Sequence, residues 1–122
     1  EHVAEMIQKM GAKHRGQSGF TPVGAVVAAT YPQQARRLRE LMPDSLFLVP
    51  GYGAQGATAA DAAASFRADG LGAVVNASRS IIFAYKQAPY AEQFGEARFA
   101  EAARAAAQQM AQELNAAIKG QP

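Results

Sequence analysis

The feature that most constrains the fold is the apolar run at residues 47–49, which passes through Pro50 into a glycine-rich turn and then into a helical pattern from Thr58. The glycines of the turn have no Cβ, so the backbone can adopt positive φ angles and approach a ligand closely. The helix that follows adds unpaired N–H groups and the positive end of its dipole. This segment predicts a strand at about residues 45–49, a phosphate-binding turn, and a helix that begins with a capping-box pattern at Thr58 and Asp61.

Two other apolar runs, at residues 23–30 and 72–78, have the same character and are also followed by helical patterns. Their nearly continuous apolar sequence indicates strands buried on both faces, as in a parallel sheet covered by helices. Alternating strands and helices predict βαβ units, and therefore the α/β class. Helices are expected at residues 1–10, 32–42, 59–68 and 90–118. We also expect a short helical stretch at residues 80–85 and a frayed tail at residues 120–122.

Apolar spacing also predicts which face of each helix is buried. The inner face of the first helix is expected to carry Val3, Met6, Ile7 and Met10. In the helix at residues 32–42 the apolar residues occupy one side, so the three arginines of that helix are expected on the solvent side. Those arginines are Arg36, Arg37 and Arg39.

Composition narrows the function classes. The chain has 122 residues, which favours one domain, and no cysteine, which excludes disulfides, thiolate catalysis and Cys-based metal sites. A net charge of +2 is too even to indicate a nucleic-acid partner, and no apolar run approaches the roughly 20 residues of a membrane span. The lack of cysteine fits a reducing compartment such as the cytoplasm. Because residue 1 is Glu rather than Met, we expect the chain to be part of a longer or processed protein.

Polar residues follow each predicted strand, and the carboxyl ends of parallel strands form one rim where ligands bind. The planar guanidinium of Arg79 matches phosphate oxygens, and the Gln55 amide is suited to bridging a phosphate and a base edge. Two other interpretations remain open: Arg79 could pair with a neighbouring carboxylate, and Gln55 could serve only the backbone of its own loop. The candidate rim residues are Thr30, Gly53, Gln55, Gly56, Asn76, Ser78 and Arg79.

The turn also matches the G-x-G-x-x-G pattern of dinucleotide-binding folds, through Gly51, Gly53 and Gly56. Such folds place an acidic residue at the end of the next strand to bind the ribose, whereas here residues 76–78 are Asn, Ala and Ser. Arg79 could still meet the additional phosphate of NADP. The alternative function is therefore an α/β module that binds NADP or another phosphate ligand without catalysis of its own.

Three segments together resemble a known family. Residues 23–32 (VGAVVAATYP), 49–57 (VPGYGAQGA) and 75–81 (VNASRSI) are similar to the sixth, seventh and eighth strand–loop segments of orotidine 5'-phosphate decarboxylase, in the bacterial subgroup with the longer chain. The resemblance implies that residues 1–122 are the C-terminal portion of one (β/α)8 TIM-barrel domain. It also implies a cytoplasmic, homodimeric lyase of pyrimidine biosynthesis that converts orotidine monophosphate (OMP) to UMP and carbon dioxide without metal or organic cofactor.

The resemblance further implies roles for single residues. Gln55 and Arg79 would hold the substrate phosphate, helped by backbone groups around Gly53 and Gly56. Pro50 would lie under the base, and Thr30 near the rim. The family often has a glycine where this chain has Ala57.

No catalytic residue is assigned, because the Lys and Asp cluster that the family uses has no counterpart in this sequence. None of the lysines, which are Lys9, Lys13, Lys86 and Lys119, lies at a predicted strand end beside an Asp. We therefore expect the cluster, and the first five barrel units, outside this segment.

Overall fold

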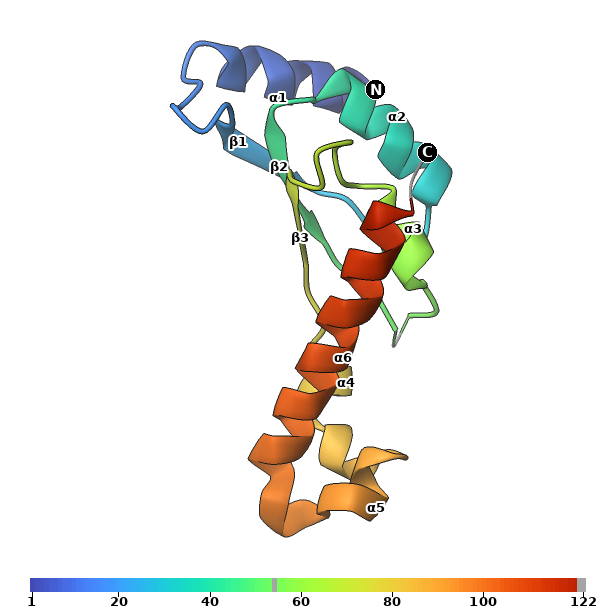
Figure 1. The fold of residues 1–122 in the computed structure, drawn as a ribbon. Helices are drawn as coiled ribbons and strands as arrows, with labels where there is room; N and C mark the ends of the chain where they lie inside the picture. The colour runs from blue at the N-terminus through green and yellow to red at the C-terminus, as the bar shows by residue number, and fades with distance from the viewer. Residues whose placement is uncertain (54, 121–122) are drawn as a thin grey trace.

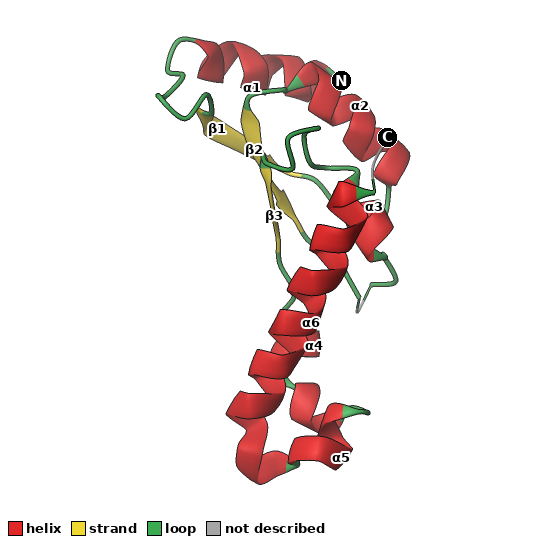
Figure 2. Ribbon diagram, in the orientation of Figure 1, coloured by secondary structure: helices red, strands yellow, loops and turns green. Residues whose placement is uncertain are grey.

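The computed structural model describes residues 1–53 and 55–120. It contains one parallel sheet of three strands in the order β1-β2-β3 (Figures 1 and 2). The strands are β1 (Thr21–Val26), β2 (Ser45–Val49) and β3 (Ala73–Val75). The predicted α/β class with parallel strands is confirmed.

Helices connect the strands and extend beyond the last one. Their bounds are α1 (His2–Ala12), α2 (Pro32–Leu41), α3 (Ala59–Ala63), α4 (Arg79–Ile82), η1 (Ala84–Lys86), α5 (Tyr90–Phe94), η2 (Glu96–Arg98) and α6 (Phe99–Lys119). The second half of α6 lies against α3 near the sheet, whereas the segment from η1 to the start of α6 projects away from it (Figure 1). That projecting segment has a small apolar cluster of its own, around Ala84, Ala102 and Ala106.

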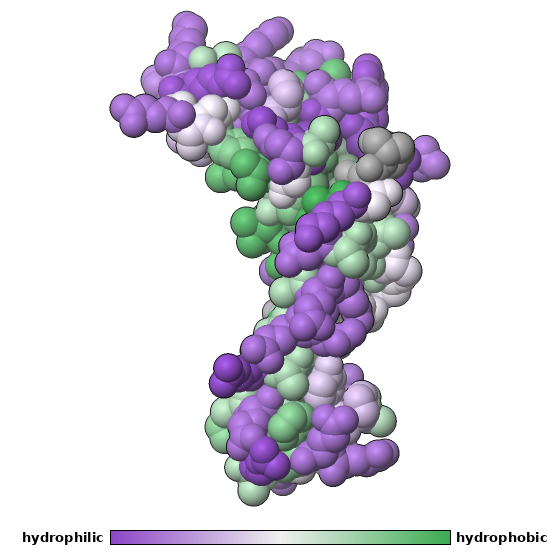
Figure 3. Space-filling view, in the orientation of Figure 1, coloured by the Kyte–Doolittle hydropathy of each residue, from purple (hydrophilic) through white to green (hydrophobic). Residues whose placement is uncertain are grey.

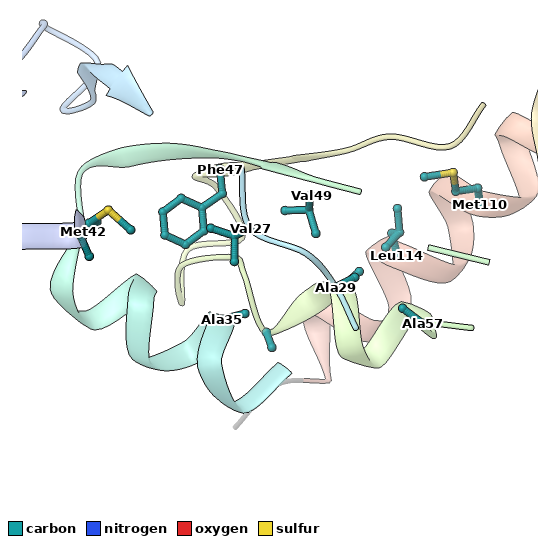
Figure 4. Close-up of a cluster of buried hydrophobic side chains, with 12 residues drawn as sticks. Val27, Ala29, Ala35, Met42, Phe47, Val49, Ala57, Met110 and Leu114 are labelled. Atoms are coloured by element: carbon teal, nitrogen blue, oxygen red, sulfur yellow. The ribbon is translucent and has the colours of Figure 1, made fainter. Parts of the chain in front are cut away.

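The main core lies between one face of the sheet and the helices. Phe47 and Val49 of β2 are almost fully buried, and Met110 and Leu114 of α6 reach the same cluster (Figure 4). The capping box predicted before α3 is present: the Thr58 hydroxyl accepts from the Asp61 N–H, and the Asp61 carboxylate accepts from the Thr58 N–H. Local capping and apolar burial thus fix α3 beside the strand end that precedes it.

The opposite face of the sheet is open, contrary to the expectation of burial on both faces. Leu46 and Leu48 alternate with the buried residues of β2 and are 45% and 44% exposed, while Val26 and Val74 are 71% and 59% exposed. These side chains gather as an apolar surface (Figure 3) and line a shallow hollow of about 380 Å³. The apolar strand sequences are thus covered on one side only within the described residues.

Three predicted boundaries differ from the structure. The strand predicted at residues 23–30 begins earlier and ends at Val26, although the N–H of Val27 still donates to the Leu48 carbonyl in β2 and the N–H of Ala29 to the Pro50 carbonyl just after it. The helix predicted at residues 59–68 ends at Ala63, because the following N–H groups donate to carbonyls three residues back. The strand predicted at residues 72–78 is limited to β3.

The single helix predicted at residues 90–118 is interrupted. Gly95 adopts a φ of 63°, outside helical geometry, and separates α5 from η2 and α6. At the other end α6 continues to Lys119. In the tail predicted at residues 120–122, Gly120 follows α6, and residues 121–122 lie outside the described residues.

The predicted faces of two helices are wrong in part. On α1, Ile7 packs against the core as predicted, but Ala4 and Gly11 are the buried residues, while Val3, Met6 and Met10 are largely exposed. The inward face is the one with small residues, which allows close approach: a Cβ at Gly11 would lie 2.7 Å from the Thr21 hydroxyl oxygen.

On α2, Arg39 is only 8% exposed, although Arg36 and Arg37 are on the solvent side as predicted. The Arg39 guanidinium lies 3.7 Å from the centroid of the Phe47 ring and donates to the carbonyls of Ser45, Ser65 and Gly72. Arg39 therefore belongs to the interior.

No helix within residues 1–53 and 55–120 combines the length and apolar character of a bilayer span.

Candidate functional site

A hollow of about 150 Å³ lies at the carboxyl ends of β2 and β3. Both chief predicted side chains, Gln55 and Arg79, line it together. The residues lining it are Pro50, Gly51, Tyr52, Gln55, Asn76, Ala77, Ser78, Arg79 and Ser80. The structure thus brings five of the predicted residues, Pro50, Gln55, Asn76, Ser78 and Arg79, to one place.

The glycines of the turn after β2 adopt the left-handed backbone conformation, which lets the turn reach the hollow. Gly51, Gly53 and Gly56 have φ angles of 104°, 70° and 89°, as the sequence suggested. The Gly53 N–H donates to the Ala57 carbonyl at 2.9 Å, and the Gly56 N–H donates to the Gly53 carbonyl at 2.8 Å. In this conformation the N–H groups of Gly53 and Gly56 donate to carbonyls of the loop itself.

Of the remaining predicted residues, Gly53 and Thr30 lie beside the hollow, and Gly56 follows in the same turn. Gly53 lines an adjoining opening of about 480 Å³ with Arg79, Ser80 and Gln87. Thr30 is exposed and lies beside the turn: a Cβ at Gly51 would be 3.5 Å from the Thr30 methyl carbon and 3.2 Å from the Gln55 side-chain oxygen. Gly51 therefore leaves space that the Gln55 amide occupies.

Arg79 is the first residue of α4, and its side chain is exposed. Among the described residues, the ion pairs use Arg15, Arg37, Arg67 and Arg98, and Arg79 takes part in none of them. Within the same residues, no side-chain hydrogen bond of Gln55 to its loop is present. The alternatives in which these two side chains serve protein groups therefore find no support in the described part of the chain.

Sequence reasoning missed Tyr52, which lies between the hollow and α6. Its hydroxyl donates to Glu113 on α6, and Glu113 also accepts from the Gln109 amide at 2.8 Å. Burial, followed by the hydrogen bond to Glu113, raises the pKa of Tyr52 to about 12. Hydrogen bonds from Tyr52 and Gln109 hold the pKa of Glu113 below its ordinary value. The available signal was position: Tyr52 is the one large apolar residue between residues 51 and 56.

The hollow offers an amide from Gln55, a guanidinium from Arg79 and hydroxyls from Ser78 and Ser80. These groups suit an anion with several oxygens, such as a phosphate. Its described lining residues include no Asp, Glu, His or Lys, and the described residues contain no cluster of three or more potential metal ligands. The site as described is thus equipped for binding rather than for proton transfer.

Strand order bears on the dinucleotide-binding alternative. In doubly wound nucleotide-binding folds the ligand lies where the strand order reverses. Here the order β1-β2-β3 follows the chain without a reversal. The strand order of the described residues therefore gives the dinucleotide-binding alternative no support, and this alternative is not favoured.

No protein-family model matches the chain. Orotidine 5'-phosphate decarboxylase of Rhodopirellula baltica is 46% identical over 114 residues, which cover 93% of this chain and 38% of the relative. The enzyme of the same name from Caldicellulosiruptor bescii is 39% identical over 118 residues, covering 97% of this chain and 37% of the relative. This chain therefore spans less than two fifths of the length of these curated relatives.

Solved structures give the same result. The structure of Leishmania donovani OMP decarboxylase matches with a TM-score of 0.65 and 32% identity, covering 98% of this chain and 38% of that one. The resemblance predicted from residues 23–32, 49–57 and 75–81 is confirmed: over nearly its whole length, this chain is similar to part of the orotidine 5'-phosphate decarboxylases.

Proposed function

We propose that this chain is the phosphate- and base-binding part of an orotidine 5'-phosphate decarboxylase. The observation that carries the proposal is the shared hollow of Gln55 and Arg79 at the carboxyl ends of two parallel strands. It is supported by the 46% identity to a decarboxylase over 93% of the chain. Asn76 and Ser78 would complete the polar wall, and Pro50 would lie under the pyrimidine.

In this proposal β1, β2 and β3 are strands six to eight of a (β/α)8 barrel, and residues 1–122 are its C-terminal portion. Such a barrel needs about 250 residues, and its phosphate site is frequently formed after the last two strands. Two exposed apolar surfaces support the proposal that the chain is only part of a barrel. They are the open sheet face with Leu46 and Leu48, and the exposed side of α1 with Val3, Met6 and Met10. The preceding strand–helix units would cover both surfaces.

The reaction would convert OMP to UMP. The bond between the pyrimidine ring and its carboxylate breaks, carbon dioxide leaves, and the carbanion that remains on the ring takes a proton from a lysine. That lysine and its partner Asp would belong to the preceding units, and neither a metal nor an organic cofactor takes part. The phosphate held by Gln55 and Arg79 is remote from the reacting carbon, so its binding energy is available for orientation and closure there. We place this enzyme in the cytoplasm as a homodimer.

The test is Arg79→Ala in the full-length protein. We expect UMP binding to weaken about 100-fold, because charged hydrogen bonds to the phosphate are lost, while uridine binding stays unchanged. Arg36→Ala, which removes another exposed arginine, is the matched control and should leave both affinities as they are. Equal losses for UMP and uridine would contradict the phosphate role of Arg79.

A second measurement tests where the catalytic group lies. The isolated 122-residue chain should not release carbon dioxide from OMP, whereas the full-length protein should. Turnover by the isolated chain would show that the proton donor lies within residues 1–122 after all.

A further inference from the structure

The glycine turn that carries Gln55 has one large side chain that packs against the rest of the molecule. Between residues 51 and 56 the sequence is Gly-Tyr-Gly-Ala-Gln-Gly, so only Tyr52 and Gln55 extend beyond a Cβ. Gln55 is exposed at the hollow, whereas Tyr52 is half-buried and packs against the main core. The glycines on both sides of Tyr52 make the backbone permissive there, so the position of the turn depends on where Tyr52 is held.

Tyr52 is held by α6. Its hydroxyl donates to one oxygen of Glu113, and the other oxygen of Glu113 accepts from Gln109 one helical turn earlier at 2.8 Å. Tyr52 lines the hollow with Gln55 and Arg79, and it also lines a separate cavity of about 190 Å³ whose walls include Gln109 and Glu113. The Tyr52 ring thus separates the ligand hollow from the surface of α6.

We propose that Glu113 is a positioning residue for ligand binding: by holding the Tyr52 hydroxyl, it fixes the turn so that Gln55 faces Arg79 across the hollow. This inference deepens the proposed function and rests on it. Glu113 does not line the hollow. Its effect is conveyed by Tyr52, and Gln109 orients its carboxylate.

The hydrogen bond from the Tyr52 hydroxyl to Glu113 is of a strong type. A carboxylate accepting from a hydroxyl is a charge-assisted hydrogen bond, which is shorter and stronger than one between neutral groups. Like any tyrosine, Tyr52 is protonated at neutral pH and can donate; burial, followed by the hydrogen bond to Glu113, raises its pKa further, to about 12. Without the acceptor, the ring would keep its apolar packing but lose the bond that sets its direction.

The experiment uses the full-length protein and compares Glu113→Leu with Glu113→Gln, which retains an acceptor for the hydroxyl. For Glu113→Leu we expect UMP affinity to fall about 10-fold and uridine affinity to stay unchanged, with KM for OMP rising more than kcat falls. Glu113→Gln should recover most of the loss. Tyr52→Phe should reproduce the effect, and Tyr52→Phe combined with Glu113→Leu should be no worse than either single change, because both remove the same bond.

Glu101→Leu is the matched control, since it removes a carboxylate from the same helix at a point where the partner is Arg98 rather than the turn. It should leave UMP affinity unchanged. Amide hydrogen exchange reports on the turn independently: Gly53 and Gly56 should exchange faster in Glu113→Leu than in the wild type. Hydrogen exchange also distinguishes a local effect on the turn from a general loss of stability, because a destabilised variant would exchange faster throughout the chain.

Unchanged UMP affinity in Glu113→Leu would overturn the inference, as would an equal loss for uridine. The failure of the proposed function is distinguishable, because the wild-type protein itself would then neither bind UMP nor decarboxylate OMP. An additive double mutant would likewise show that Glu113 and Tyr52 do not act through a common bond.

Discussion

An arginine is placed at each end of the sheet, and the two have opposite surroundings. Arg39 lies at the amino end of β2 and β3, where it is 8% exposed and donates to several backbone carbonyls. Arg79 follows β3 at the carboxyl end, is exposed, and pairs with no carboxylate among the described residues. A guanidinium surrounded by protein acceptors thus serves the fold, whereas one that lines an open hollow remains available to a ligand.

Two glycines, one within β1 and one in the turn after β2, also differ in what requires them. Gly24 in β1 is required for space, since a Cβ there would lie 2.4 Å from the Leu46 carbonyl oxygen. Gly56 in the turn has no heavy atom within 4 Å of such a Cβ, but its φ of 89° disfavours other residues. Close packing thus governs the first glycine and backbone conformation the second.

Arg39→Met should give the largest effect on stability. It leaves the carbonyls of Ser45, Ser65 and Gly72 without their donor in the interior, so we expect the free energy of unfolding to fall by roughly 3 to 5 kcal/mol. Chemical denaturation of the full-length protein measures the loss. Arg36→Met on the exposed side of α2 should change it little. Equal effects of the two substitutions would remove the distinction between a buried and an exposed arginine.

Gly24→Ala should come next. Its methyl group would displace the Leu46 carbonyl, and the overpacking should cost about 1 to 3 kcal/mol of unfolding free energy. UMP affinity should be preserved, since Gly24 does not line the hollow. A thermal melt with and without UMP checks both statements. A loss of affinity without a loss of stability would contradict the assignment of Gly24 to the fold.

Gly56→Ala should show the reverse pattern. The methyl group has room, so only the left-handed backbone is penalised, by about 1 kcal/mol. The strain falls on the turn that presents Gln55, so UMP binding should weaken more than the unfolding free energy alone would suggest. Calorimetric titration with UMP decides. Unaltered affinity would show that the turn tolerates a changed backbone at Gly56.

Asp61→Asn should give the smallest effect, and one that depends on pH. Hydrogen bonds from the Thr58 N–H and hydroxyl hold the pKa of Asp61 below its ordinary value. The contribution of a lowered carboxyl pKa is fully present above the ordinary pKa of aspartate, about 3.9, and is lost as the pH falls through the lowered pKa. The wild type should therefore be slightly more stable than the variant at pH 7, and the difference should vanish on acidification. A constant difference across the acid range would exclude the charged cap as its source.

The predicted helix and strand boundaries were most accurate where the residues that end or begin an element lie close together in the chain. The structure gives β2 the predicted bounds, since Pro43 and Pro50 enclose an apolar run, and the capping box at Thr58 and Asp61 is formed by residues three positions apart. The predicted long terminal helix failed at Gly95, where one positive φ was not apparent from an alanine-rich pattern. Arg39 failed for a different reason: its acceptors Ser65 and Gly72 are 26 and 33 residues away in the chain.

The candidate site shows the same division. That Gln55 and Arg79 would meet followed from parallel strands, because their carboxyl ends share one edge. That Tyr52 would turn toward α6 did not follow, because Glu113 lies 61 residues further along the chain.

The strand–helix alternation, the glycine turn and the resemblance to the decarboxylases could all be predicted, since they depend on the order of residue types along short segments. The open sheet face, the interior position of Arg39 and the contact of Glu113 with Tyr52 became apparent only in the folded chain. Burial and hydrogen-bond partners depend on atoms brought together from distant segments, and a local pattern of apolar and polar residues does not specify which of its polar groups will find such a partner.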